Sequence, residues 1–246
     1  MDLQAAAVAN MVAWWERVAL ARGGFVHHSE FVAVLDGLGT NPITNRAVVL
    51  TPDADSAAVA AVVRETFDRR AGGVIGLLDP WDHVALHGDG WSDSATVILP
   101  EMIYPSTSTR PPNLGDIRVV EGADALLQFE DVTRRGFDFV RWDDTAILPP
   151  SVLGTVARAF IAYDDGEPVA CAIAHDYAGV TGVYLVATLP AARGRGFGEA
   201  VSWAATAAFG AQPATLQASE MGGPVYARMG YETTRLMRLW IRERNS

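Results

Sequence analysis

The chain has 246 residues, of which 50% are hydrophobic and 20% are charged, and its formal net charge is −10. This length and composition exclude an intrinsically disordered chain and suit one large domain or two small ones. The acidic balance argues against nucleic acids and anionic membranes, which require a basic surface, and is compatible with a cationic amine substrate.

The first half of the chain alternates helical and strand patterns. Hydrophobic spacing predicts helices at 3–21 and 57–70 and strands at 31–35, 47–50, 74–78 and 95–99. Residues 105–113, which follow, are rich in proline, serine and threonine and show no hydrophobic period. This composition predicts a linker that divides the chain into domains 1–104 and 114–246.

The second half predicts a longer series of elements. The pattern indicates strands at 117–120, 182–188, 215–218 and 235–242, a hairpin of 158–163 and 168–174, and helices at 122–139, within 151–160, at 197–209 and at 219–229. Ser219 is expected to cap the last of these helices. The order of elements predicts an α/β layout around one mixed sheet.

The two halves share a local pattern. Residues 48–56 and the segment from Val186 onward both read as strand, proline, loop and helix, which predicts a tandem repeat of one fold. The first loop contains Asp53 and Asp55 but no glycine. Because two carboxylates repel a diphosphate, the first copy is expected to be degenerate as an anion site.

The most informative motif is Arg-Gly-Arg-Gly-Phe-Gly at 193–198, between the apolar run 183–190 and a helical segment. A glycine-rich turn from strand to helix directs backbone N–H groups and the positive end of the helix dipole at an anion. The motif therefore predicts a diphosphate site, to which Arg193 and Arg195 can contribute. The alternatives are a structural turn with solvated arginines and a dinucleotide-binding loop.

This loop resembles the pyrophosphate loop of the GCN5-related N-acetyltransferases (GNATs), and two flanking segments resemble the same family. In that family the preceding strand, here Val186, Ala187 and Thr188, leaves backbone groups free to bind the pantetheine arm and polarise the thioester carbonyl. Residues 219–231 resemble the family pattern Asn-x6-Tyr-x3-Gly-Phe, with serine in place of asparagine and tyrosine in place of phenylalanine.

The resemblance implies an α/β (α+β mixed sheet) protein of the acyl-CoA N-acyltransferase (GNAT) fold, in two tandem copies. It also implies acetyl coenzyme A (acetyl-CoA) as co-substrate and direct attack by a primary amine of a small molecule or peptide. An acetyl donor is not distinguished from a longer acyl donor. The implied cofactor-binding residues are Val186, Ala187, Thr188, Arg193, Gly194, Arg195, Gly196, Phe197, Gly198 and Ser219.

Three residues are candidates for proton transfer. Tyr226 matches the tyrosine that in relatives protonates the departing thiolate, and a tyrosine that only packs in the core is the alternative. His175, at a strand end, and Glu220, before a helix, can each accept a proton directly or through water. The alternatives are a structural histidine and a carboxylate that complements a helix N-terminus.

Particular residues favour or disfavour other functions. A non-catalytic acetyl-CoA or CoA sensor or scaffold is the alternative function, because no single general base stands out. A nucleotide-dependent oxidoreductase is disfavoured, because no acidic ribose-binding residue follows the loop at the required distance. No metal is expected, because the histidines and aspartates of 81–87 match no metal-ligand spacing.

Residue usage bounds the remaining possibilities. The chain contains no lysine, which excludes Schiff-base and P-loop lysine chemistry. Its single cysteine, Cys171, lies in an apolar run and is expected to be a buried thiol. No apolar run is long enough for a bilayer and the N-terminus lacks a basic signal region, so a cytoplasmic location is expected. The apolar strand 235–242 predicts either a buried strand or a homodimer contact.

Overall fold

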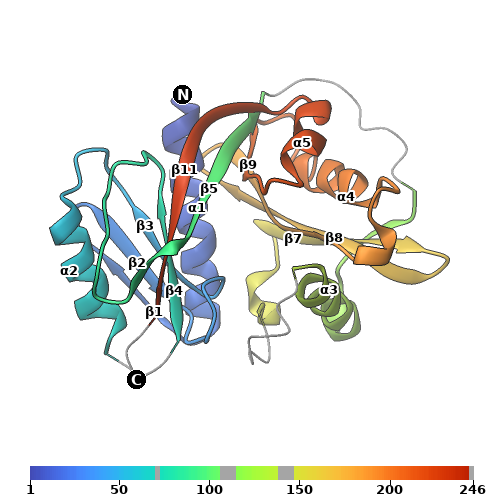
Figure 1. Cartoon of the computed structure of the whole chain (residues 1–246). Helices are drawn as coiled ribbons and strands as arrows, with labels where there is room; N and C mark the ends of the chain where they lie inside the picture. Colours follow the sequence, from blue (N-terminus) through green and yellow to red (C-terminus); the bar gives the residue numbers. More distant parts are fainter. Residues whose placement is uncertain (70–72, 106–114, 138–146, 244–246) are drawn as a thin grey trace. The chain divides into compact units, whose positions relative to one another are not determined.

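The computed structural model describes residues 1–69, 73–105, 115–137 and 147–243 (Figure 1). The chain divides into two compact units, each named here for the half that supplies most of it. The C-terminal unit comprises Met1–Met11, Met102–Arg141 and Pro150–Thr233, and the N-terminal unit comprises Val12–Glu101, Trp142–Pro149 and Thr234–Ser246. Most of the predicted linker and the end of the predicted helix 122–139 lie outside the described residues.

The C-terminal unit is built on a mixed sheet with the strand order β5-β10-β9-β8-β7-β6. Its strands are β5 (Trp91–Tyr104), β6 (Ile117–Val119), β7 (Ala157–Asp164), β8 (Glu167–Tyr177), β9 (Val180–Thr188) and β10 (Ala214–Gln217). Strands β6 to β9 are antiparallel neighbours, whereas β10 runs parallel to β9. The mixed sheet expected from the sequence is therefore confirmed.

Helices cover both faces of this sheet. They are α3 (Gly122–Gly136), α4 (Phe197–Thr206), α5 (Gly223–Met229), the start of α1 (Leu3–Ala21) and the 3-10 turns η2 (Pro150–Val152) and η3 (Pro190–Ala192). Successive residues of β8 point to opposite faces. Ala170, Ala172 and Ala174 belong to a hydrophobic cluster with α4, whereas Cys171 contacts Thr133 of α3. Figure 1 accordingly shows α4 and α3 on opposite sides of β7 and β8.

The N-terminal unit has the strand order β1-β2-β3-β4-β11-β5. Its further elements are β1 (Phe25–His28), β2 (Val32–Asp36), β3 (Asn45–Val49), α2 (Ser56–Phe67), β4 (Val74–Asp79) and β11 (Glu232–Glu243). Helix α2 buries Val59, Val63 and Phe67 against this sheet. The side chain of Asp55 caps the helix by accepting the N–H of Ala58 at 2.8 Å. One carboxylate of the first loop therefore has a structural use.

Each unit contains a parallel strand–helix–strand segment. Helix α2 joins the parallel strands β3 and β4, and α4 joins the parallel strands β9 and β10. In both cases an antiparallel series, β1-β2-β3 or β7-β8-β9, precedes the helix. The units thus share a local topology, and a tandem repeat stays a prediction.

Each unit is completed by a strand that comes from the other half of the chain. Strand β11 pairs antiparallel with β4, and its Arg235 and Arg242 form ion pairs with Glu101 and Asp68 at 2.7 and 2.6 Å. Residues Met102–Tyr104 of β5 belong to the C-terminal unit, in which β5 neighbours β10. Thus β11 pairs within the chain, as the buried-strand alternative requires.

Most predicted elements are confirmed with ends displaced by a few residues, but two predictions are wrong and one strand is missed. The helix predicted within 151–160 is only the turn η2, after which β7 begins. Strand β1, whose pattern is short, is not predicted at all. The helix predicted from Ser219 begins at Gly223, because the Ser219 carbonyl and hydroxyl accept the N–H of Gly222 and hold a turn there.

Candidate functional site

A β-bulge interrupts β9 at the residues predicted to face the thioester. Cys171 pairs with Ala187 and Ile173 pairs with Tyr184, so β9 carries one more residue than β8 between these pairs. Leu185 lies in the bulge with φ of 48°, in the left-handed region that side chains rarely adopt. Backbone strain of this kind concentrates at functional sites.

The thiol of Cys171 lies beside the bulge. Its Sγ is 3.8 Å from the carbonyl oxygen of Leu185 and 3.3 Å from Oγ1 of Thr133. Burial raises the pKa of the Cys171 thiol to about 12, despite hydrogen bonds from Thr133 and the backbone of Ala187. The thiol is therefore protonated at neutral pH and unreactive, as its apolar sequence surroundings predict.

Strands β9 and β10 separate just before the bulge. Their register comprises Thr181 with Ala214 and Gly182 with Thr215, and within the described strands it goes no further. The edge of β9 from there to Thr188 is consequently not paired with β10. Backbone N–H and C=O groups along this edge can hydrogen-bond a ligand.

The glycine motif forms an exposed turn at the start of α4. Gly194 and Gly196 have φ of 74° and 87°, and a Cβ at either position would meet no atom within 4 Å. Backbone conformation, not lack of space, requires glycine at both. Gly196 is the N-cap of α4 and no side chain caps the helix. The first-turn amides of α4 are thus open to an anion.

Gly198 is required for a different reason. A Cβ at this position would lie 2.8 Å from Oγ1 of Thr188. Helix α4 therefore begins in close contact with the end of β9, and a Cβ at this position would have to displace the Thr188 side chain. The third glycine brings the loop and the bulged strand into one site.

Both arginines of the motif are bound to the protein. Arg193 donates to the carbonyl oxygens of Thr188 and Gly136 at 3.3 and 2.9 Å. Arg195 forms a bidentate ion pair with Asp164 at 2.7 and 3.0 Å. These bonds hold the loop against β9, the end of α3 and the end of β7. A contact of either arginine with phosphate stays a prediction.

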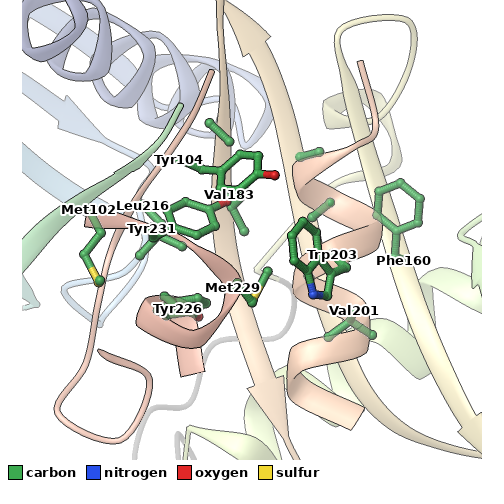
Figure 2. Close-up of a cluster of buried hydrophobic side chains, with 14 of the residues drawn as sticks. Met102, Tyr104, Phe160, Val183, Val201, Trp203, Leu216, Tyr226, Met229 and Tyr231 are labelled. Atoms are coloured by element: carbon green, nitrogen blue, oxygen red, sulfur yellow. The ribbon is translucent and has the colours of Figure 1, made fainter. Parts of the chain in front are cut away.

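Tyr226 lies in the hydrophobic cluster between the sheet and helices α4 and α5 (Figure 2). Its hydroxyl is hydrogen-bonded to Ser202, which in turn donates to the carbonyl of Gly198 at 2.7 Å. This chain of contacts connects Tyr226 to the first turn of α4. Burial raises the pKa of Tyr226 to about 12, so the hydroxyl stays protonated. Gly222 leaves room for the ring, because a Cβ there would lie 2.8 Å from it.

The other two predicted proton-transfer residues lie in contrasting places. Glu220 is exposed in the turn that follows β10, next to Ser219. His175 is 3% exposed on β8, opposite Gly182 and about 10 Å along the strand from the bulge. Its Nδ1 lies 3.4 Å from Oδ1 of Asn10. The surroundings of His175 fit a structural histidine.

Asn10 of α1 is a central polar residue that sequence patterns miss. It is fully buried, and its Nδ2 donates to the carbonyls of His175, Tyr177 and Val180 at 3.1, 3.1 and 2.9 Å. Its Oδ1 accepts the hydroxyl of Tyr184 at 2.8 Å. The nearest of these partners is 165 positions away in sequence, so no local motif could reveal the contact. The sequence does not reveal the role of Leu185 either, because nothing in the residues around it indicates a positive φ.

The described residues contain neither a metal-binding cluster nor a membrane-spanning helix. Within residues 1–69, 73–105, 115–137 and 147–243, no group of three or more His, Cys, Asp or Glu side chains could hold a metal ion. In the 81–87 segment Asp82 is paired with Arg238, and Nε2 of His83 lies 3.0 Å from the carbonyl of Ala54. Among the helices of these residues, none combines the length and apolarity needed to cross a bilayer.

The site segment matches a known family. The sequence profile of the acetyltransferase (GNAT) domain matches residues 156–233, which include the bulge, the glycine loop and Tyr226. No curated protein sequence matches the chain.

Solved structures share the fold along the whole chain. A GCN5-related N-acetyltransferase from Kribbella flavida is 20% identical with a TM-score of 0.70, over 100% of this chain and 97% of that one. A putative GNAT-family acetyltransferase from Novosphingobium aromaticivorans is 18% identical with a TM-score of 0.60, over 94% and 98%. A GCN5-related N-acetyltransferase-like protein from Streptococcus suis is 12% identical with a TM-score of 0.57, over 99% and 100%.

At these identities the structural likeness concerns the fold, and the profile match concerns residues 156–233. Both agree with the family resemblance of the glycine loop, the preceding strand and the Tyr226 segment. Residues 156–233 therefore match the acetyltransferase (GNAT) domain, and the chain as a whole has the fold of solved GCN5-related N-acetyltransferase structures.

Proposed function

We propose that the protein is an acetyl-CoA-dependent N-acetyltransferase that acts on a primary amine of a small molecule or peptide. One observation carries the proposal: the uncapped N-terminus of α4, behind its glycine turn, adjoins a bulged strand that has separated from its neighbour. The GNAT domain match at residues 156–233 supports acyl transfer in general. The arrangement adds an anion cradle and unpaired backbone groups, which acetyl-CoA binding needs.

In this proposal the backbone of Arg193–Gly198 binds the diphosphate, with Arg193 and Arg195 at its margin. The backbone of Val186–Thr188 binds the pantetheine arm and the thioester, and Ser219 lies at the end of the separated strand β10. A cytoplasmic location and the absence of a metal requirement remain part of the proposal.

The chemistry follows from these placements. The amine nitrogen attacks the thioester carbonyl carbon, the carbonyl becomes an oxyanion, and the C–S bond then breaks. A backbone N–H near the bulge stabilises the oxyanion. Tyr226 donates a hydrogen bond and then its proton to the departing thiolate, and the amine proton passes to a base. Glu220 through solvent and His175 through water are the two candidates for that base.

Calorimetric titration with acetyl-CoA tests the central claim. Gly196→Glu places a carboxylate at the helix N-terminus and is expected to abolish saturable binding. Gly210→Glu is the matched control, because Gly210 also has φ of 87° and open space, but at the far end of α4. Absence of binding by the wild type, or equal loss in both variants, would contradict the proposed diphosphate site.

Release of CoA with a panel of amines separates enzyme from sensor. Turnover with any amine supports the transferase. Saturable acetyl-CoA binding without turnover on the whole panel would favour the non-catalytic sensor or scaffold. That alternative is supported by the two candidate bases, because Glu220 is exposed and His175 is buried.

A further inference from the structure

Two buried hydroxyl groups lie one turn apart on helix α4. Ser202 is 1% exposed and Thr206 is 4% exposed. The Ser202 hydroxyl donates to the carbonyl of Gly198, and the Thr206 hydroxyl donates to the carbonyl of Ser202, both at 2.7 Å. Serine and threonine favour a helix less than alanine does, and alanine occupies positions 200, 204 and 205 of the same helix. Helix formation therefore does not explain the two hydroxyls.

Each hydroxyl holds the side chain of one tyrosine. Oγ1 of Thr206 lies 2.6 Å from the hydroxyl oxygen of Tyr231, and the hydroxyl of Tyr226 is hydrogen-bonded to Ser202. The two tyrosine rings contact each other edge to face in the cluster of Figure 2, with centroids 5.8 Å apart. The two pairs share their chemistry and differ in place, because Ser202 lies one turn, about 5.4 Å, nearer to the N-terminus of α4. Of the two pairs, Ser202 with Tyr226 is the one that reaches the glycine motif, through Gly198.

The direction of the hydrogen bonds in this pair follows from the number of hydrogens. A hydroxyl carries one hydrogen, and that of Ser202 is donated to the carbonyl of Gly198. The Ser202 oxygen can therefore only accept from Tyr226, whose hydroxyl is held in one orientation before any reaction. The Gly198 carbonyl does not depend on this bond, because in an α-helix it also accepts the N–H four residues further on. Ser202 can thus turn its hydrogen elsewhere at little cost.

We infer that Ser202 is a positioning residue for Tyr226, which holds the tyrosine hydroxyl before proton transfer and donates to its oxygen afterwards. The inference rests on the proposed acetyltransferase function and on Tyr226 as the proton donor in it. The proton moves from the Tyr226 oxygen to the sulfur of the CoA thiolate, so that an S–H bond forms while the O–H bond breaks. Ser202 then turns its hydrogen from Gly198 to the Tyr226 oxyanion. The proton that the amine releases returns to Tyr226 through the base and solvent, which restores the starting state.

The surroundings of Tyr226 make this second bond important. Tyr226 is 7% exposed within an apolar cluster, where an oxyanion without a hydrogen-bond donor is costly. Burial raises the pKa of Tyr226 to about 12, and the bond to Ser202 is the contact that opposes this rise. Burial also raises the pKa of Tyr231, and the neighbouring rings of Tyr226 and Tyr104 raise it further, despite the bond to Thr206. The Thr206–Tyr231 pair therefore serves as a natural control that has the same bonds but no role in proton transfer.

A comparison of Ser202→Ala with Thr206→Val tests the inference. Kinetics are measured with acetyl-CoA and the amine of the panel that gives the fastest turnover. Ser202→Ala is expected to lower kcat about tenfold, because a hydrogen bond to a charged oxygen is lost, and to leave the Kd for acetyl-CoA unchanged. Thr206→Val removes a hydroxyl from the partner of Tyr231 and is expected to lower the melting temperature while kcat stays within about twofold of the wild type.

Two further variants separate positioning from packing. In the Tyr226→Phe background Ser202→Ala is expected to cause no additional fall in kcat, because the oxygen that Ser202 serves is already absent. Ser202→Thr keeps the hydroxyl and is expected to retain kcat within about threefold. Thr206 shows that a threonine of this helix can bond both the carbonyl four residues earlier and a tyrosine.

The outcomes distinguish the inference from the function on which it rests. Unchanged kcat in Ser202→Ala, an equal fall with and without the Tyr226 hydroxyl, or weaker acetyl-CoA binding at unchanged kcat overturns the inference, because Ser202 would then only support α4. Each of these results leaves the acetyltransferase proposal intact, as does a Tyr226→Phe variant with wild-type kcat, which overturns the inference by removing the donor. Failure of the wild type to bind acetyl-CoA, or to acetylate any amine, overturns the proposed function and the inference with it.

Discussion

The three glycines of the 193–198 motif look alike in sequence but meet different demands. Gly194 and Gly196 adopt positive φ in open space. Gly198 instead lacks the Cβ that would collide with Thr188, and so α4 can contact that residue. Substitutions at the first two strain the backbone, and a substitution at the third creates a steric conflict with one side chain. The steric conflict at position 198 can be relieved by shortening the Thr188 side chain.

A double-mutant cycle tests this distinction. Gly198→Ala is expected to lower the free energy of unfolding by about 1–2 kcal/mol, because its Cβ would crowd Oγ1 of Thr188. In the Thr188→Ala background the same change should cost nothing or stabilise, since alanine favours a helix. Urea denaturation of the four proteins measures the coupling. Additive effects would show that Thr188 is not the obstacle.

Tyr226 combines burial with a contact to the first turn of α4. Tyr226→Phe keeps the ring packing, and we expect kcat for amine acetylation to fall about 10- to 100-fold while acetyl-CoA affinity stays unchanged. Because burial raises the pKa to about 12, we expect no loss of kcat through ionisation of this tyrosine below about pH 11. Steady-state kinetics from pH 6 to 10.5 measure both effects.

Tyr231→Phe is the matched control for Tyr226. The hydroxyl of Tyr231 is buried and bonded to Oγ1 of Thr206 at 2.6 Å, so its loss should reduce stability without the same loss of kcat. Equal kcat in Tyr226→Phe and the wild type would mean that Tyr226 only packs in the core.

At the scale of elements, α1 is joined to β8 and β9 by one side chain. Asn10 satisfies three carbonyls at the ends of these two strands and accepts the hydroxyl of Tyr184. Gly182 is small for the same reason, because a Cβ there would lie 2.1 Å from Oδ1 of Asn10. Helical periodicity predicts α1 correctly but cannot show which residue anchors it.

Removing that anchor should be costly. Asn10→Ala leaves buried carbonyls without a donor and opens a cavity, so the free energy of unfolding is expected to fall by on the order of 3 kcal/mol. Leu20→Gln on the same helix is the control, since Leu20 is 54% exposed and should change stability by less than about 0.5 kcal/mol. Chemical denaturation of both variants compares them, and equal stability would refute the anchoring role.

At the scale of the whole molecule, neither half of the chain contains a complete unit. The N-terminal unit takes β11 from the end of the chain, and buried Glu101, with no exposed surface, depends on Arg235 of that strand. The C-terminal unit takes Met1–Met11 and Met102–Tyr104 from the first half. A division at the linker therefore separates strands that belong together.

This exchange predicts the behaviour of split chains. Residues 1–105 and 115–246 expressed separately are expected to lack a cooperative unfolding transition, because β4 loses β11, one of its two neighbours, and Glu101 loses its counter-ion. Co-expressed, the two fragments should purify as one complex. Size-exclusion chromatography tests whether the fragments form a complex, and thermal denaturation tests whether each unfolds cooperatively. A cooperatively folded 1–105 fragment would contradict the expectation.

How far the sequence predicts the protein differs from element to element. Periodicity locates α1, β4, β9 and α4, and the glycine motif places a turn correctly between β9 and α4. The same reasoning extends a helix over 151–160, where two prolines start only a single 3-10 turn. It assigns Arg195 to solvent or phosphate, although Asp164 binds it from 31 positions away.

The sequence by itself determined the local structure, the mixed α/β class and the family resemblance, because periodicity, turn residues and short motifs act over a few positions. Tertiary structure alone decided the bulge at Leu185, the separation of β10 from β9, the bonds of Asn10 and the exchange of end strands. Each of these depends on which distant segments meet, and that is decided by packing and by the satisfaction of buried hydrogen bonds.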